Sequence, residues 1–258
     1  MKERMVDIPT AAGTMDAFVA HPSDGGPFPA VIIYMDVWGL REELFDIARR
    51  IAVAGYYCMV PNFYYREGKI RSEYRNDKGQ MITLDSLDAE RRALVLAPLA
   101  RLSDAMVIED TGAILRFLDT DPSARRNSPV GCIGYCMGGR HVFQAVAHYP
   151  DRFRAAASLH GTDLVIDGPE SPHLGVLKGG GELYCGFGEK DRHTPLSTVE
   201  AVEQTLRSRG PRYRYEVHKG ADHGYALPDR DVFDKQGANR DWEIIFPMFH
   251  RQLQPYLT

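Results

Sequence analysis

The feature that most constrains the fold is an alternation of short apolar runs with longer amphipathic segments along the chain. Residues 30–34 (AVIIY) form a continuous apolar run between Pro29 and Gly39. The next segment, 41–55, repeats apolar residues at helical spacing and ends at Gly55. Strands that are apolar throughout are typical of a sheet covered on both faces. The alternation therefore predicts an α/β fold with a mostly parallel sheet and helices on both of its faces.

The same patterns predict the remaining elements. Strands are expected at 5–10, 14–22, 30–34, 56–62, 129–134, 153–161, 181–191 and 212–220, the first two forming a hairpin. Helices are expected at 41–55, 136–150, 194–210 and 239–257, with two further helical segments between 85 and 122 that break near Pro98. Thr194 is expected to cap the helix that has Pro195 at its first position, and Gly210 to end that helix.

Nothing in the pattern divides the chain. It has no internal repeat and no Gly/Ser-rich linker, so residues 1–258 are expected to form one domain, with a polar excursion or cap at about 63–101. With 44% hydrophobic and 26% charged residues, the composition is that of an ordinary globular protein.

Charge and cysteine content exclude several classes of partner. The net charge of −4 offers no attraction to nucleic acid or to an acidic membrane surface. The first ten residues, MKERMVDIPT, lack the apolar core of a signal peptide, and no run is long enough to span a membrane. A cytoplasmic protein with reduced thiols is expected, acting as a monomer or homodimer on a small molecule. No cluster has metal-ligand spacing, so neither a metal nor a cofactor is expected.

The segment 131–141, GCIGYCMGGRH, has the spacing of a nucleophile turn, with Cys136 between Gly134 and Gly138. It follows a predicted strand and precedes a predicted helix, at the edge where ligands bind to parallel sheets. The glycines leave room for a tight turn. The helix directs its free N–H groups and the positive end of its dipole at the thiol, which favours the reactive thiolate. We therefore predict Cys136 to be a nucleophile.

A thiol needs a base, and acyl-transfer sites on this architecture supply a histidine oriented by a carboxylate, in the chain order nucleophile, acid, histidine. Asp191 follows one late strand and His223 follows the last, which satisfies that order. His160 also ends a strand but precedes Asp191 and breaks the order, whereas Asp163 is a substitute for the acid. Each of these residues also has a purely structural interpretation, as a packing turn, a helix cap or a surface histidine.

Four segments together resemble the dienelactone hydrolases: GYCMGG at 134–139, GEKD ending at Asp191, GADHGY around His223, and YMDVWGL at 34–40. The resemblance covers nearly the whole chain. It implies the α/β-hydrolase fold and a Cys136–His223–Asp191 triad that hydrolyses esters or enol-lactones.

The resemblance also implies an oxyanion hole made by the backbone N–H groups of Val37 and Met137. The best-known members carry a glutamate that helps to activate the thiol, and this chain has the shorter Asp36 at that position. The structural interpretation of Asp36 is a hydrogen bond to nearby backbone.

Substrate-binding residues are predicted less directly. Members that act on dienelactone carry an arginine four residues after the catalytic histidine, where this chain has Leu227, and Arg230 is the nearest replacement. The segment 63–101 supplies six more arginines that are candidates for binding an anionic substrate: Arg66, Arg71, Arg75, Arg91, Arg92 and Arg101. Trp38, Tyr135 and Tyr225 adjoin the motif residues and are expected to wall an apolar pocket.

Two other functions stay open at this level. A thiol redox protein would pair Cys136 with Cys132, although their CxxxC spacing with one partner inside a strand supports this weakly. A non-catalytic binding protein would keep the fold without turning over any ester. The covalent thioester route favours activated esters, enol-lactones and thioesters over peptides, because an amine leaving group would let the thiolate depart first.

Overall fold

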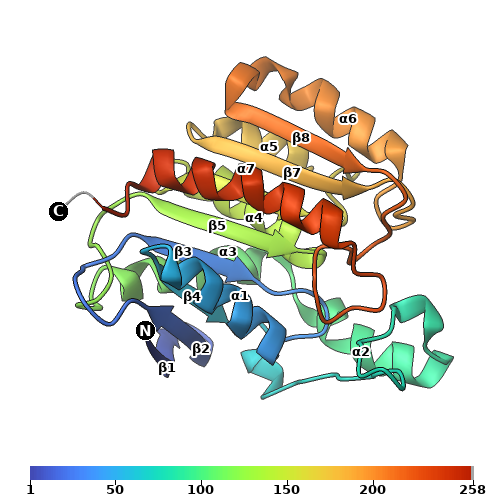
Figure 1. Ribbon diagram of the computed structural model, residues 1–258, viewed down its shortest axis with the longest axis horizontal. Helices are drawn as coiled ribbons and strands as arrows, with labels where there is room; N and C mark the ends of the chain where they lie inside the picture. The colour runs from blue at the N-terminus through green and yellow to red at the C-terminus, as the bar shows by residue number, and fades with distance from the viewer. Residues whose placement is uncertain (257–258) are drawn as a thin grey trace.

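The computed structural model describes residues 1–256, and its centre is one eight-stranded sheet (Figure 1). The strands are β1 (Lys2–Thr10), β2 (Gly13–His21), β3 (Ala30–Tyr34), β4 (Tyr57–Pro61), β5 (Val130–Tyr135), β6 (Phe153–Leu159), β7 (Glu182–Gly188) and β8 (Tyr213–His218). Their order in the sheet is β1-β2-β4-β3-β5-β6-β7-β8. Strand β2 pairs antiparallel with β1 and with β4, and all the other neighbouring strands pair parallel. The predicted mostly parallel sheet is therefore confirmed.

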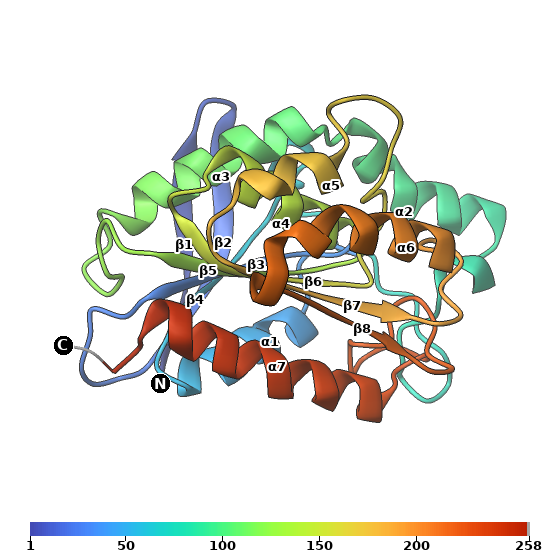
Figure 2. The same ribbon diagram turned by 90° about the horizontal axis from the view of Figure 1, so that it is seen from above.

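Helices cover both faces of the sheet, as predicted. They are α1 (Glu42–Val53), α2 (Ala89–Arg101), α3 (Asp104–Leu118), α4 (Met137–His148), α5 (Pro172–Gly175), α6 (Leu196–Leu206) and α7 (Lys235–Leu253), with short 3-10 turns at Tyr65–Glu67, Leu84–Ser86, Val176–Lys178 and Arg207–Arg212. Figure 2 shows α1 and α7 on one face and α3, α4, α5 and α6 on the other. Strands β3, β4 and β5 are buried along their whole length between these layers, which explains their continuous apolar runs.

Three details of the predicted helices are wrong. Pro98 lies inside α2, and the break falls at Leu102, which is extended, before Ser103 caps α3. Thr194 does not cap α6, because its hydroxyl donates to the Gly161 carbonyl at 2.7 Å, and Pro195 occupies the cap position. The last helix begins at Lys235 rather than 239, since Asp234 accepts the Gln236 and Gly237 N–H groups. That helix ends at Leu253, and the predicted end at 257 lies outside the described residues.

The segment predicted as an excursion lies at the carboxyl edge of the sheet. Figure 1 shows the arrowheads of β5, β7 and β8 pointing to one edge, with α2 beyond it. Its residues Met81, Leu87 and Val95 pack with Val37 and Trp38 in a hydrophobic cluster separate from the main core. The Met81 N–H donates to the Asp229 carbonyl at 2.7 Å, which ties this segment to the chain that follows β8. The excursion therefore covers the edge where ligands bind in parallel sheets.

Candidate active site

Cys136 stands on a tight turn between β5 and α4, with φ 57° and ψ −121°. A side chain with Cβ in this region of φ is strained, and the surrounding structure has to hold it there. The neighbouring glycines make this possible. A Cβ at Gly134 would lie 2.1 Å from the Gly138 carbonyl oxygen, and one at Gly138 would lie 2.2 Å from the Tyr34 carbonyl oxygen. The turn can therefore form only with glycine at both positions.

The turn holds the Cys136 side chain at the start of α4. Its backbone N–H donates to the Leu159 carbonyl and to His160 Nδ1, both at 3.1 Å. The side chain opens into a cavity of about 360 Å³ at the carboxyl edge of the sheet. Met137 is the first residue of the helix, and the first N–H groups of a helix have no acceptor within it. The positive end of the α4 dipole thus faces the sulfur.

His223 and Asp191 meet Cys136 from two separate strand ends. Asp191 follows β7, His223 follows β8, and His223 Nδ1 lies 2.8 Å from Asp191 Oδ2. The other oxygen of Asp191 accepts the His193 and Thr194 N–H groups, which fixes a fully buried carboxylate. His223 and Cys136 line the same cavity, and the charge of Cys136 acts on the His223 imidazole. The structure thus brings the three predicted residues together, in the predicted order along the chain.

The charges around His223 favour its protonated form. Burial by itself lowers the pKa of the imidazole, but the charge of Cys136 and the hydrogen bond to Asp191 outweigh burial and raise the pKa to about 10. A protonated imidazole beside the sulfur stabilises a thiolate, which is the nucleophilic form of cysteine.

The Asp36 carboxylate binds Arg41 rather than Cys136. It is fully buried and takes both ends of the Arg41 guanidinium, with N–O distances of 2.6 and 2.9 Å. It also accepts the backbone N–H of Trp38 at 3.1 Å, as its structural interpretation predicts. Arg41 in turn binds Asp229 at 2.6 Å. Among residues 1–256 the Asp36 carboxylate makes no hydrogen bond to Cys136, and both of its oxygens bind the Arg41 guanidinium.

The cavity beside Cys136 contains two of the four predicted substrate-binding residues. Trp38 and Arg230 line it, and the guanidinium carbon of Arg230 lies 5.3 Å from the centre of the Trp38 ring. Tyr135 and Tyr225 are fully buried and lie outside the lining. The hydroxyl of Tyr225 is held by Asp241 at 2.8 Å.

Arg230 is a buried cation that faces this cavity. It is 4% exposed, its Nε has no hydrogen-bond partner among residues 1–256, and no ion pair involves it within that range. Burial, and then the charge of Arg41, lower the pKa of its guanidinium, although the charge of Asp36 opposes them. None of the six arginines of 63–101 lines the cavity, and five of them pair with acidic side chains on or near their own segment.

Several residues of the site gave no clear signal in the sequence. Arg192, His193 and the turn at Thr83–Ser86 all line the cavity. His160 precedes Asp191 in the chain and so breaks the expected order, yet its ring lies 4.9 Å from that of His223, measured between centres. Burial, followed by the charge of His223, keeps the pKa of His160 well below its usual value, so the ring is neutral. His160 therefore holds the Cys136 backbone without competing for the proton.

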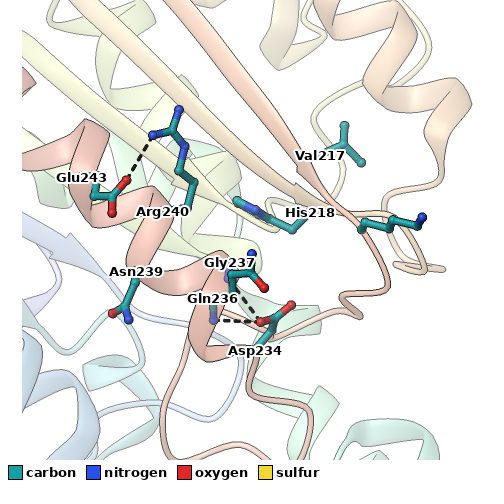
Figure 3. A pocket seen from close by; sticks show the side chains of 9 residues that line it. Val217, His218, Asp234, Gln236, Gly237, Asn239, Arg240 and Glu243 are labelled. Atoms are coloured by element: carbon teal, nitrogen blue, oxygen red, sulfur yellow. Dashed lines mark hydrogen bonds and ion pairs between the residues drawn. The ribbon is translucent and has the colours of Figure 1, made fainter.

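Asp163 and Cys132, the substitute acid and the second thiol, lie outside the cavity. Asp163 is exposed, and its negative charge contributes to raising the pKa of the Arg140 guanidinium. Cys132 is fully buried within β5, and burial raises the pKa of its thiol. A larger cavity of about 660 Å³ lies between the end of β8 and the start of α7 (Figure 3), and it includes none of Cys136, Asp191 and His223.

Residues 1–256 contain neither a metal-binding cluster nor a membrane-spanning helix. No group of three or more His, Cys, Asp or Glu side chains within this range is arranged to hold a metal ion. In the same part of the chain, no helix combines the length and the apolar character needed to cross a membrane.

The sheet order, the strained turn at Cys136 and the His–Asp pair facing it define an α/β-hydrolase. Comparisons with known proteins agree. Residues 15–253 match the Dienelactone hydrolase family, and the chain therefore belongs to that family and is a carboxylic ester hydrolase.

Relatives and solved structures extend over the whole chain. A Synechocystis protein named "Putative carboxymethylenebutenolidase" is 26% identical over 257 residues, which cover 98% of each chain. The crystal structure of a "Putative Dienelactone Hydrolase" from Klebsiella pneumoniae is similar with a TM-score of 0.81 and 24% identity, over 97% of this chain and 98% of that one. The metagenomic "Dienelactone Hydrolase-like Promiscuous Phospotriesterase P91" has a TM-score of 0.76 and 18% identity over the same shares. These structures support the α/β-hydrolase fold.

Proposed function

We propose that this enzyme cleaves a small carboxyl ester or enol-lactone through a thioester on Cys136, with His223 as its base and Asp191 as the group that orients His223. One observation carries the proposal. The His223 imidazole is hydrogen-bonded to a buried carboxylate at 2.8 Å and lines the same cavity as Cys136. A nucleophile, a base and an orienting acid in this arrangement form the machinery of acyl transfer.

The reaction has two halves. His223 holds the proton of Cys136, and the thiolate attacks the carbonyl carbon to form a tetrahedral oxyanion, which accepts hydrogen bonds from the Val37 and Met137 N–H groups. Collapse of this intermediate breaks the bond to the leaving oxygen, which takes the proton from His223. In the second half, His223 removes a proton from water, the hydroxide attacks the thioester, and the acid leaves as the thiolate returns.

The chemistry of the leaving group selects the substrate class. A thiolate leaves a tetrahedral intermediate more readily than an amine, so amides would return to substrate. Alkoxides and enolates compete better with the thiolate, and esters and enol-lactones can therefore complete the first half. A peptidase is therefore disfavoured.

Arg230 favours a substrate that carries an anionic group. It is a buried cation on the wall of the cavity that contains Cys136. The name of the Synechocystis relative refers to a butenolide with a carboxymethylene group, which combines an enol-lactone with such an anion. Leu227 occupies the position of the arginine expected from the family, so Arg230 would replace that arginine from a site three residues later.

Hydrolysis of p-nitrophenyl acetate tests the proposal directly. Cys136→Ala should abolish turnover, whereas Cys132→Ala should retain it because Cys132 is buried in β5 away from the cavity. Iodoacetamide should label Cys136 ahead of Cys58, Cys132 and Cys185, which are fully buried. Full activity in Cys136→Ala would overturn the assignment of the nucleophile. A Cys132–Cys136 disulfide after mild peroxide, in a protein without esterase activity, would instead indicate the redox function.

A further inference from the structure

A single carboxylate lies behind the loop that carries His223. Asp241 on α7 is fully buried, and three side chains donate hydrogen bonds to it. Tyr184 Oη and His218 Nε2 reach its Oδ1 at 2.6 and 2.7 Å, and Tyr225 Oη reaches its Oδ2 at 2.8 Å. Both carboxylate oxygens are therefore satisfied by groups from other parts of the chain.

These donors belong to the segments that deliver the acid and the base. Tyr184 is on β7, the strand that precedes Asp191. His218 is the last residue of β8, five positions before His223, and Tyr225 comes two positions after His223. Asp241 thus binds the chain on both sides of His223, although α7 itself does not reach the cavity beside Cys136.

The packing around Asp241 leaves little freedom for movement. A Cβ at Gly186 of β7 would lie 2.4 Å from Tyr225 Oη and 2.8 Å from Asp241 Oδ1. The backbone of β7 therefore packs closely against both groups. On the other side, a Cβ at Gly237 would lie 3.0 Å from His218 Cγ. Figure 3 shows the His218 side chain pointing from the end of β8 toward this first turn of α7.

The contacts continue from Tyr225 to the reacting groups. The Tyr225 ring lies 5.6 Å from the His160 ring, between centres, and His160 packs against His223 at 4.9 Å. His160 Nδ1 also accepts the Cys136 N–H. A shift of Tyr225 would therefore displace His160, and through it both His223 and the Cys136 backbone.

The loop between the two anchors has no regular secondary structure and is held by turn hydrogen bonds, among them those from the Ala221 N–H to the His218 carbonyl and from the Tyr225 N–H to the Asp222 carbonyl. Gly220 and Gly224 both have positive φ, and the residues between them follow no helix or strand. Backbone hydrogen bonds from Glu189 to the His218 carbonyl and from Lys190 to the Ala221 carbonyl join it to the loop of Asp191, but these act before His223 in the chain. Beyond His223, the Tyr225 hydroxyl donates to Asp241, and the Tyr225 carbonyl accepts the Asp234 N–H at 2.9 Å.

We propose that Asp241 is a positioning residue for catalysis: by holding His218 and Tyr225 it fixes both ends of the loop that sets His223 against Cys136. This inference rests on the proposed function, because it assigns Asp241 an effect on the Cys136–His223 pair. It predicts that the hydrogen bond of Tyr225 matters for catalysis, whereas that of Tyr184, which lies within a core strand, matters only for stability.

The test compares Tyr225→Phe with Tyr184→Phe as a matched control. Both changes remove one hydroxyl that donates to Asp241, and both rings are buried to the same degree, at 0% and 1% exposed. Tyr225→Phe and Asp241→Asn should lower kcat for p-nitrophenyl acetate by about 10- to 100-fold, the cost of misplacing a reacting group. KM should stay within about threefold, because substrate binding is not changed. Tyr184→Phe should keep kcat within about twofold of wild type.

A second measurement does not depend on ester turnover. The rate at which iodoacetamide alkylates Cys136 is followed against pH, and it reports how much thiolate His223 stabilises. Tyr225→Phe should shift this profile to higher pH and Tyr184→Phe should not. If the two variants lose kcat equally and leave the profile unchanged, Asp241 has a structural role only and the inference is overturned.

The two proposals can fail separately. A wild-type protein that hydrolyses no ester would refute the proposed function, and the alkylation profile would still test the positioning of His223. Ester hydrolysis in wild type with unchanged kcat and profile in Tyr225→Phe would refute the role of Asp241 and leave the function in place. If Asp241→Asn does not fold, the pair of tyrosine variants carries the test by itself.

Discussion

Replacing Asp191 with asparagine tests whether a carboxylate orients His223. Asp191 Oδ1 accepts the His193 and Thr194 N–H groups at 2.8 and 3.1 Å, and Oδ2 faces His223 Nδ1 at 2.8 Å. An asparagine that keeps its oxygen on the two backbone donors must turn its NH₂ group toward Nδ1. Nδ1 can then only accept, so the ring proton moves to Nε2 and the imidazole can no longer take a proton from Cys136.

The size of the effect follows from this change of tautomer. In serine enzymes with the same arrangement it costs about 10⁴-fold in kcat, or about 5.5 kcal/mol at 1.36 kcal/mol per tenfold. We expect a fall of about 10³- to 10⁴-fold for p-nitrophenyl acetate, measured under saturating substrate. Burial lowers the pKa of His223, and Cys136 and Asp191 together raise it to about 10. In Asp191→Asn that pKa should fall, which NMR titration of the histidine can measure.

Asp163→Asn is the matched control, because Asp163 is the other acid that the sequence offered. It is exposed, its φ of 50° suits asparagine, and its charge acts on Arg140. Its kcat and the His223 titration should equal those of wild type. The reasoning is refuted if Asp191→Asn stays within about tenfold of wild type, or if Asp163→Asn shows the larger loss.

Two further predictions concern Arg230 and His218. Arg230→Ala should reduce kcat/KM for a carboxylate-bearing ester by about 10- to 100-fold, the value of a charge-assisted hydrogen bond, and should spare a neutral ester of equal size; equal losses for both esters would contradict it. Burial lowers the pKa of His218, but Asp241, Glu216 and Asp234 raise it above its usual value. A raised pKa stabilises the fold fully below about pH 6.5, and this contribution is lost as the pH rises through the folded-state value. The excess free energy of unfolding of wild type over His218→Gln should therefore decline above about pH 6.5 in urea titrations, and an excess that grows with pH would contradict the pairing.

Local patterns predicted most of the elements because each pattern reports the immediate surroundings of a segment. The apolar run at 30–34 is buried on both faces of the sheet, and the spacing of the run at 41–55 matches α1. Errors arose where a specific hydrogen bond decided the outcome. Thr194 is a good capping residue by type, but its hydroxyl donates to the distant Gly161 carbonyl. The start of α7 depends on the capping side chain of Asp234 rather than on the apolar period.

The sequence by itself determined the turn at Cys136, since glycine at 134 and 138 is required by backbone contacts that any such turn makes. It also placed Asp191 and His223 after the strands whose carboxyl ends share one edge, because parallel pairing brings those ends together. Only the tertiary structure decided that Asp36 pairs with Arg41 and that Tyr225 turns to Asp241 on the last helix. No repeating sequence pattern connects the residues in these contacts. A buried polar group costs free energy unless it is hydrogen-bonded, so its partner is the group that the packing brings within reach.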